Sequence, residues 1–201
     1  MHAPLPEDSE PKISVFSLPV GPAPSVPRPM GAGHTHAGPV FAYILRGEIE
    51  NQVEPDPPRT YKPGEFFYET PGHIHRFLRN LSTTDPARLI IFEAGYTGPA
   101  APVIKLLLEE TLPSTVNQEL SLLRRTLPPR GSSESGAYSG PGVIYILDGK
   151  IETSGVGQSK IYSVGDLFPV SADAAGLTFR NTSGSAPAQL LLYQVSGKRA
   201  P

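Results

Sequence analysis

The sequence predicts an all-β protein that contains two tandem barrels. Two observations carry this prediction: short apolar segments separated by Gly and Pro, and an internal repeat. The 201-residue chain has 24 prolines and 20 glycines, which fall between segments such as "VFAYIL", "RLIIFEA" and "QLLLYQV". Short apolar strands separated by turns of this kind are typical of an antiparallel sandwich or barrel.

The repeat consists of three segments that recur in the same order at an offset of 101 or 102 residues. The first copies begin at Gly38, Tyr61 and Arg79, and the second copies begin at Gly140, Tyr162 and Arg180. In the first pair, "GPVFAYILRGEIE" corresponds to "GPGVIYILDGKIE" without a gap. We interpret this pattern as the tandem duplication of a β domain of roughly 100 residues. The predicted domains are residues 1–110 and 111–201.

Each copy is expected to contain a strand, a tight turn and a return strand. The turns fall at Arg46-Gly47 and Asp148-Gly149, and Asp-Gly favours a β-hairpin because both residues tolerate positive φ. Further glycine-containing turns open new strands, and strands with this spacing are expected to build a double-sheet jelly roll.

Two segments near the middle of the chain connect the copies. Residues 103–108 predict a strand that covers the neighbouring sheet or contacts a dimer partner. Residues 114–125, "STVNQELSLLRR", predict a short linking helix, because Ser114 can cap a helix and Leu120 and Leu123 have helical spacing.

Composition excludes several classes of function. The formal net charge of -2 gives no reason to expect nucleic acid or an anionic membrane as a partner. No apolar run approaches the ~20 residues that span a bilayer, and the polar segment "MHAPLPEDSEPK" has no signal-peptide core. The chain has no cysteine, which excludes disulfides, thiolate ligands and a thiol nucleophile. We therefore expect a cytoplasmic protein.

Every histidine except His2 lies in the first copy of the repeat, in two pairs. The pairs are His34 with His36 and His73 with His75, and the matching residues of the second copy are Gly136, Tyr138, Ala174 and Gly176. The second copy is expected to fold without imidazoles at these positions. The histidines therefore indicate an added function rather than a need of the architecture.

The spacing of the histidines predicts a metal site. Residues i and i+2 of an extended strand point to the same face, so His34 and His36 are expected to aim together. His75 follows the Pro71-Gly72 turn on a separate strand and would complete a set of three imidazoles. Imidazole suits zinc, copper, iron and nickel, with manganese as a further alternative. Three protein ligands leave a coordination position open, as catalytic metal sites do.

At these residues the chain resembles the cupin superfamily, and specifically a two-domain bicupin. "HTHAGPVFAYILRG" supplies the His-x-His pair and the closing Gly47 of the first cupin motif. "GEFFYETPGHIHRFLRN" supplies the second motif, with Gly64, Pro71, Gly72, His75 and Asn80. The resemblance covers most of both halves. It implies two RmlC-like jelly-roll barrels, with a three-histidine metal site in the N-terminal one only.

The sequence departs from the cupin pattern at two positions. Val40 stands where the family has a glutamate ligand, and Asn80 lies one residue further from His75 than usual, which a β-bulge could absorb. The missing glutamate makes the chain similar to the three-histidine subgroup of cupins, some of which are iron-dependent dioxygenases. The candidates for completing the metal shell are His73, Glu69 and Gln52.

The pocket is expected to be apolar. Val40 and Ala42 share a strand face, and if that face looks at the metal, the pocket floor is small and suits a hydrophobic or aromatic molecule. Phe66, Phe67 and Tyr68 are first of all core residues and are also candidates for lining the pocket.

The arginines near the motifs are interpreted as a solvated rim, although Arg46, Arg76 and Arg79 could also attract an anionic substrate. Arg79 recurs as Arg180 in the copy without histidines, so we interpret it as structural. Tyr43 recurs as Tyr145 and is assigned to packing for the same reason.

The leading functional hypothesis is a metal-dependent enzyme that acts on a small organic molecule. His34, His36 and His75 would bind one divalent ion, with Fe(II) favoured and Zn, Mn, Ni or Cu as alternatives. With Fe(II), the resemblance implies a dioxygenase-type oxidoreductase. With zinc or manganese, the ion would serve as a Lewis acid in lyase, isomerase or hydrolytic chemistry. The candidate catalytic residues are His75 and His73, the latter as a group that supports the metal ligands.

Two readings from other classes stay open. One is a non-catalytic module that binds a small molecule, and the other is a metal-free isomerase or cyclase that uses His75 as a general base. For the assembly, a homodimer is an open alternative.

Overall fold

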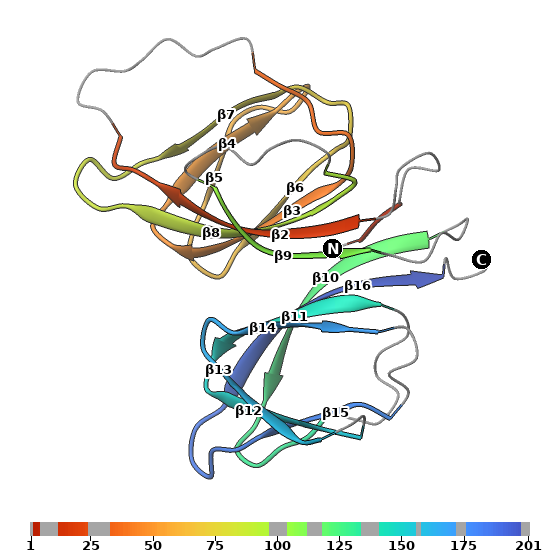
Figure 1. Cartoon of the computed structure of the whole chain (residues 1–201). Helices are drawn as coiled ribbons and strands as arrows, with labels where there is room; N and C mark the ends of the chain where they lie inside the picture. The colour runs from red at the N-terminus through yellow and green to blue at the C-terminus, as the bar shows by residue number, and fades with distance from the viewer. Residues whose placement is uncertain are drawn as a thin grey trace. The chain divides into compact units, whose positions relative to one another are not determined.

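The regular secondary structure is entirely β in the part of the chain that the structure, a computed structural model, describes (Figure 1). The described residues are 2–4, 12–23, 33–96, 104–111, 118–133, 141–155, 158–171 and 176–197. They fall into an N-terminal unit, Pro6–Ser114, and a C-terminal unit that combines Met1–Leu5 with Thr115–Pro201. The all-β class predicted from the sequence is confirmed.

The N-terminal unit consists of two antiparallel sheets. Its strands are β2 (Lys12–Val20), β3 (Val40–Arg46), β4 (Ile49–Val53), β5 (Arg59–Tyr61), β6 (Phe66–Glu69), β7 (His75–Asn80), β8 (Ala87–Ala94) and β9 (Lys105–Thr111). The five-stranded sheet has the order β6-β3-β8-β2-β9, and the three-stranded sheet has the order β5-β4-β7. The strand expected at residues 103–108 is therefore β9, which pairs with β2.

The C-terminal unit repeats this topology. Its strands are β1 (His2–Pro4), β10 (Gln118–Leu127), β11 (Gly142–Asp148), β12 (Lys150–Ser154), β13 (Lys160–Ser163), β14 (Leu167–Val170), β15 (Thr178–Asn181) and β16 (Ala188–Gly197). The sheet orders are β1-β10-β16-β11-β14 and β13-β12-β15. Strand β1 holds the edge position that β9 has in the N-terminal unit. The predicted first domain began at residue 1, whereas Met1–Leu5 group with the C-terminal unit, since β1 pairs with β10.

The short linking helix predicted over residues 114–125 is wrong for the described part of that segment, and residues 114–117 lie outside it. Gln118–Leu127 form β10, which pairs with β16 along all 10 of its residues. Leu120 and Leu122 are 0% and 2% exposed, and a spacing of two residues places both on one face of a strand. Pairing with β16 thus overrides the local pattern that suggested a helix.

The turns at Arg46-Gly47 and Asp148-Gly149 are present, but neither closes a hairpin. Strand β3 pairs with β6 and β8, whereas β4 pairs with β5 and β7. The chain therefore passes from the larger to the smaller sheet at this turn. The same change of sheet occurs between β11 and β12.

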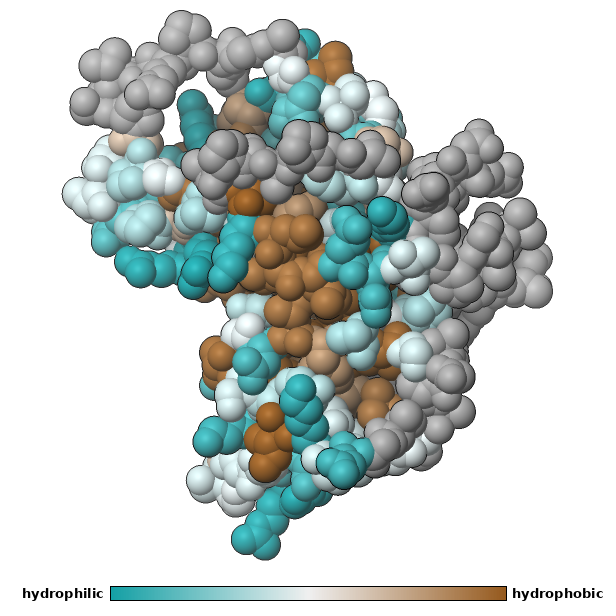
Figure 2. Space-filling model, in the orientation of Figure 1, coloured by the Kyte–Doolittle hydropathy of each residue, from teal (hydrophilic) through white to brown (hydrophobic). Residues whose placement is uncertain are grey.

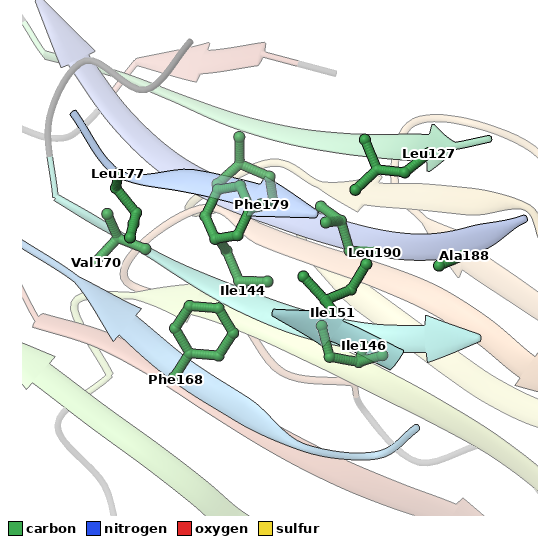
Figure 3. Close-up of a cluster of buried hydrophobic side chains, with 11 residues drawn as sticks. Leu127, Ile144, Ile146, Ile151, Phe168, Val170, Leu177, Phe179, Ala188 and Leu190 are labelled. Atoms are coloured by element: carbon green, nitrogen blue, oxygen red, sulfur yellow. The ribbon is translucent and has the colours of Figure 1, made fainter. Parts of the chain in front are cut away.

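The core of each unit contains side chains from both of its sheets. In the N-terminal unit the buried cluster consists of Ala42, Ile44, Ile49, Phe67, Ala87 and Leu89. Figure 3 shows the cluster of the C-terminal unit, where Ile144 and Phe168 from the larger sheet face Ile151 and Phe179 from the smaller one. Burial of these apolar surfaces stabilises the pairing of the sheets.

One polar residue of the second cupin motif is structural in both units. Asn80 Nδ2 donates to Asp85 O at 2.6 Å, and Asn181 Nδ2 donates to Ala186 O at 2.8 Å. Because the same bond forms in the copy without histidines, the fold needs this asparagine irrespective of the metal site.

Hydrophilic side chains cover much of the face seen in Figure 2, and hydrophobic ones also reach it. Among the described residues, the exposed large hydrophobic side chains are Leu81, Leu106, Ile161 and Val164. The described residues also contain no helix with the length and apolar character needed to cross a membrane.

We predict that Gly149→Ala destabilises the protein more than Gly165→Ala. Both glycines have positive φ, 77° and 87°, so alanine at either position costs about 1–2 kcal/mol in backbone strain. A Cβ at position 149 would also lie 2.8 Å from Ala188 Cβ, whereas a Cβ at position 165 would meet no atom within 4 Å. Urea unfolding should therefore show that the free energy of unfolding falls by about 1–3 kcal/mol more for Gly149→Ala than for Gly165→Ala. Equal losses for the two variants would contradict this account.

Candidate metal centre

Backbone pairing at the start of β7 brings the three histidines together. His34 N donates to His75 O at 3.1 Å, and His75 N donates to His34 O at 2.8 Å, forming an isolated antiparallel bridge. Gly72 N donates to His36 O at 3.0 Å. Gly33, with φ of 81°, allows the close approach, because a Cβ there would lie 2.8 Å from His75 O. The loop with His34 and His36 is therefore fixed against the segment with His75.

A register irregularity absorbs the extra residue that the sequence has after His75. Gln52 of β4 pairs with Phe77, but the next residue, Val53, pairs with His75. Arg76 is therefore the additional residue on β7, as in a β-bulge. The bulge expected from the motif spacing is present at this position.

The imidazole rings of the three histidines converge. His34 Nε2 lies 3.1 Å from His36 Nε2, and one candidate ligand atom from each of His34, His36 and His75 lies within 4.8 Å of the others. Two nitrogens bound to one zinc ion at about 2.0–2.1 Å would be about 2.8–3.4 Å apart for angles between about 90° and 109°. The Nε2 atoms of His34 and His36 therefore already have the spacing of two ligands of one ion.

The donor set fits a divalent cation. His75 is 8% exposed, and neither of its ring nitrogens has a hydrogen-bond partner among the described residues. A buried polar atom without a partner destabilises the fold, and a bound cation would remove that cost at one of the two nitrogens. Imidazole is a common ligand of zinc, iron, copper and nickel. The three-histidine cluster therefore suggests a divalent metal site.

Two buried glutamates flank the cluster. In the larger sheet, Val40 of β3 lies directly opposite Glu69 of β6 and Glu93 of β8. These glutamates are 3% and 5% exposed. Glu69 Oε2 lies 3.0 Å from His36 Nε2, and Glu69 Oε1 lies 3.5 Å from His75 Nε2. On the other edge of its ring, His36 Nδ1 lies 3.0 Å from Glu93 Oε1.

The glutamates determine which imidazole carries a proton. Burial lowers the pKa of His36, but hydrogen bonds and charges of Glu69 and Glu93 outweigh burial and raise this pKa from 6.5 to about 10. Burial also lowers the pKa of His75, and the charges of His34 and His36 add to this effect against that of Glu69. Without a metal, His36 is therefore expected to be cationic and His75 neutral at pH 7.

The cluster lies on the wall of a cavity of about 460 Å³. The larger apolar side chains that line this cavity are Phe16, Leu18, Val40, Leu78, Ile91 and Ile104. Leu18, Leu78 and Ile91 also pack against the core cluster of the unit. These three side chains therefore separate the cavity from the hydrophobic core. Neither lysine nor arginine is among the described residues that line the cavity.

The structure does not bring His73 or Gln52 into the cluster. His73 is exposed, and its Nδ1 lies 2.8 Å from the carbonyl oxygen of Glu54. Gln52 Nε2 donates to the carbonyl oxygen of Asp56 at 3.4 Å. Of the three side chains that the sequence suggested for completing the metal shell, Glu69 is the one that reaches the histidines.

The expectation that Phe66, Phe67 and Tyr68 line the pocket is wrong. Phe67 is 2% exposed and, together with Ala42, belongs to the core cluster. Phe66 and Tyr68 point to the opposite face of β6 from Glu69, because side chains alternate along a strand. The cavity lining includes Glu69 from this strand and none of its three aromatic residues.

Arg79 has a partner that recurs in the second unit. Arg79 pairs with Glu50 between β7 and β4, and Arg180 pairs with Glu152 between β15 and β12. This repetition supports the structural interpretation of Arg79. The side chain of Arg46 is 64% exposed, as expected for a solvated rim.

The two copies differ at the positions around Val40. The strand pairing around Val40 is the same in the two units. Val40 is paired with Glu69 and Glu93 in the N-terminal unit, and the corresponding residues of the C-terminal unit are Gly142, Val170 and Gln194. Both carboxylates are thus replaced by uncharged residues in the copy that lacks the histidines. Val170 instead packs in the apolar cluster of its unit (Figure 3). The glutamates therefore vary together with the histidines, as residues of one site would.

Glu93 is not predictable as a site residue from motif spacing. It stands in "RLIIFEAG", and its approach to His36 depends on the register of β8 against β3, which no local pattern specifies. The signal that could have identified it is the exchange of Glu93 for Gln194 between the copies.

Comparison with known proteins supports the cupin superfamily. Residues 26–93 match the family model of the cupin domain. No curated protein matches the chain.

Several solved structures have a similar fold. A Cupin 2 conserved barrel domain protein from Leptotrichia buccalis matches with a TM-score of 0.55 and 16% identity over 98% of this chain and 88% of that chain. The protein YhaK from Escherichia coli matches with a TM-score of 0.57 and 17% identity over 92% and 86% of the respective chains. Oxalate decarboxylase from Bacillus subtilis, whose structure was described with Mn(II) centres, matches with a TM-score of 0.56 and 12% identity over 96% and 71%. The fold is consistent with tandem cupin domains.

We predict that part of the stability of the metal-free protein depends on His36 and falls as the pH rises. The folded-state pKa of His36, about 10, exceeds its unfolded value of 6.5. This contribution is therefore fully present below about pH 6.5 and is lost as the pH rises toward about 10. Urea unfolding between about pH 6 and pH 9 should show that the free energy of unfolding is larger for wild type than for His36→Gln. This difference should shrink with increasing pH. A difference that stays constant or grows would contradict the prediction.

Proposed function

We propose that this protein is a bicupin whose N-terminal unit binds one divalent metal ion and acts on a small apolar molecule. His34, His36 and His75 would hold the ion, and the C-terminal unit would serve as a scaffold without metal ligands. The observation that carries the proposal is the convergence of three imidazoles on the wall of a largely apolar cavity. Three protein ligands leave room for a substrate atom at the ion.

The residues around the cluster would prepare it for binding and chemistry. Glu93 accepts a hydrogen bond from His36 Nδ1, which fixes the ring so that Nε2 faces the other histidines. The apolar walls would exclude water from a bound molecule and strengthen electrostatic interactions inside the cavity. A bound divalent ion would supply Lewis-acid chemistry, and Fe(II) would in addition supply redox chemistry with O2.

Dioxygenase-type oxidation with Fe(II) is the proposed reaction. It is supported by the three converging imidazoles, a ligand type that suits iron, and by a cavity suited to a hydrophobic or aromatic substrate. A second candidate is lyase, isomerase or cyclase chemistry. It is supported by the similar fold of an oxalate decarboxylase described with Mn(II) centres, since a divalent ion can act as a Lewis acid. Oxygen consumption by the Fe(II)-loaded protein with neutral aromatic compounds would support the first, and product formation under anaerobic conditions would support the second.

We predict that His34→Ala and His75→Ala abolish stoichiometric metal binding, whereas His73→Ala keeps it. The first two variants remove converging imidazoles, and His73 is exposed and lies outside the cluster. Elemental analysis of purified proteins measures the bound metal, and circular dichroism verifies that each variant is folded. Wild-type protein that is folded and free of metal after incubation with Fe(II), Mn(II) and Zn(II) would overturn the proposal.

We predict that the Mn(II)-loaded protein does not convert oxalate, the substrate named for one of the proteins with a similar fold. The described cavity lining contains two buried carboxylates and lacks arginine and lysine. The carboxylates already balance the two positive charges of the ion, so a dianion would enter without further compensating charge. Formate and CO2 should stay at the level of the metal-free control. Turnover of oxalate by a sample with verified Mn(II) content would refute this view of the cavity.

A further inference from the structure

We infer that Glu69 is the anionic ligand of the metal centre, supplied from β6 in place of the glutamate that the cupin motif has on β3. The inference rests on the proposed function, because it assigns a fourth ligand to the same ion. It also explains how the chain can have Val40 at the motif position without losing the carboxylate from the site.

The register of the sheet makes this relocation feasible. Val40 and Glu69 are directly paired neighbours on β3 and β6, and both line the cavity. The Cβ atoms of such a pair are about 4.5–5.5 Å apart, which is less than the combined reach of two glutamate side chains extended toward each other. A carboxylate can therefore approach the same point from either strand.

The distances place the Glu69 carboxylate among the converging ligand atoms. Glu69 Oε2 lies 3.0 Å from His36 Nε2, close to the 3.1 Å between His36 Nε2 and His34 Nε2. Glu69 Oε1 lies 3.5 Å from His75 Nε2 and accepts a hydrogen bond from Asn51 Nδ2 at 3.3 Å. Asn51 is itself buried, so it holds the carboxylate in this orientation.

Glu93 has a different position and a different task. Its Oε1 lies 3.0 Å from His36 Nδ1, on the ring edge opposite Nε2. It is therefore a positioning residue that acts through His36, whereas Glu69 faces the nitrogens that would bind the ion. The pair provides a matched comparison, because both side chains are buried glutamates on strands next to β3.

The duplicated unit supports a functional reading of Glu69. The matching residue there is Val170, which is 4% exposed and belongs to the apolar cluster. The fold therefore accepts valine at this ladder position. A buried carboxylate is costly unless it is paired, so its presence in the unit with the histidines needs a partner such as a cation.

The experiment transfers the carboxylate from β6 to the paired position on β3. We compare wild type with Glu69→Val, Glu69→Gln, Glu93→Gln and the double variant Val40→Glu/Glu69→Val. The measured quantities are Co(II) affinity, by chelator competition, and the Co(II) absorption spectrum. Thermal unfolding of the metal-free proteins verifies folding. Glu69→Val and Glu69→Gln should lower Co(II) affinity by about 100-fold and change the spectrum, and the double variant should recover affinity to within about tenfold. Glu93→Gln should lower affinity by about tenfold and keep the wild-type spectrum.

Each alternative result has a distinct meaning. Wild-type affinity and spectrum in Glu69→Gln would overturn the ligand role and leave the proposed function intact. A folded double variant without recovery would also overturn the ligand role, since the carboxylate would then be needed on β6 for another reason. Wild-type protein that binds no Co(II) would overturn the proposed function and this inference together. If the double variant does not fold, the spectrum of Glu69→Gln decides.

Discussion

Two backbone hydrogen bonds between His34 and His75 are the interaction on which the rest of the candidate site depends. They tie the loop that carries two imidazoles to the strand that carries the third. Because main-chain groups make this bridge, the rings are brought together before any side chain interacts with a ligand. Without the bridge, gathering three imidazoles from separate segments would require a large loss of conformational entropy at the moment of binding.

The electrostatics of the site follow from that arrangement. Glu69 and Glu93 are buried on either side of His36, and two carboxylates in an apolar wall need positive charge nearby. A proton on His36 compensates one of them, and the raised pKa of His36 reflects this pairing. A divalent cation held by neutral imidazoles would compensate both.

Much of the fold was predictable because the chain contains it twice. The repeat and the alternation of apolar segments with Gly and Pro turns indicated an all-β protein. The departure in motif spacing allowed for a bulge, which the strand pairing places at Arg76. The prediction failed at residues 118–125, where leucines with helical spacing lie in β10. Pairing with β16, which is distant in the sequence, decides the structure of that segment.

The site was predictable only where its residues lie in local motifs. His34, His36 and His75 follow from their spacing, and Glu69 was one of three alternatives. Glu93 was missed, since strand register rather than sequence proximity brings it to His36. The aromatic residues of β6, interpreted first as core, were also candidates for lining the cavity, because the sequence alone does not tell where along a strand face the core ends and the cavity begins.

Strand β1 has a consequence for how the chain can be assembled and dissected. His2–Pro4 pair with β10, and His2 lies opposite Ser121, so this strand has no partner until the whole N-terminal unit has been synthesised. Such long-range pairing slows folding, because the intervening loop must close first. A recombinant fragment that starts at Thr115 would lack β1 and would leave β10 as a bare edge, open to pairing with another chain. An isolated C-terminal unit is therefore expected to have a protected edge when residues 2–4 are joined to it by a linker.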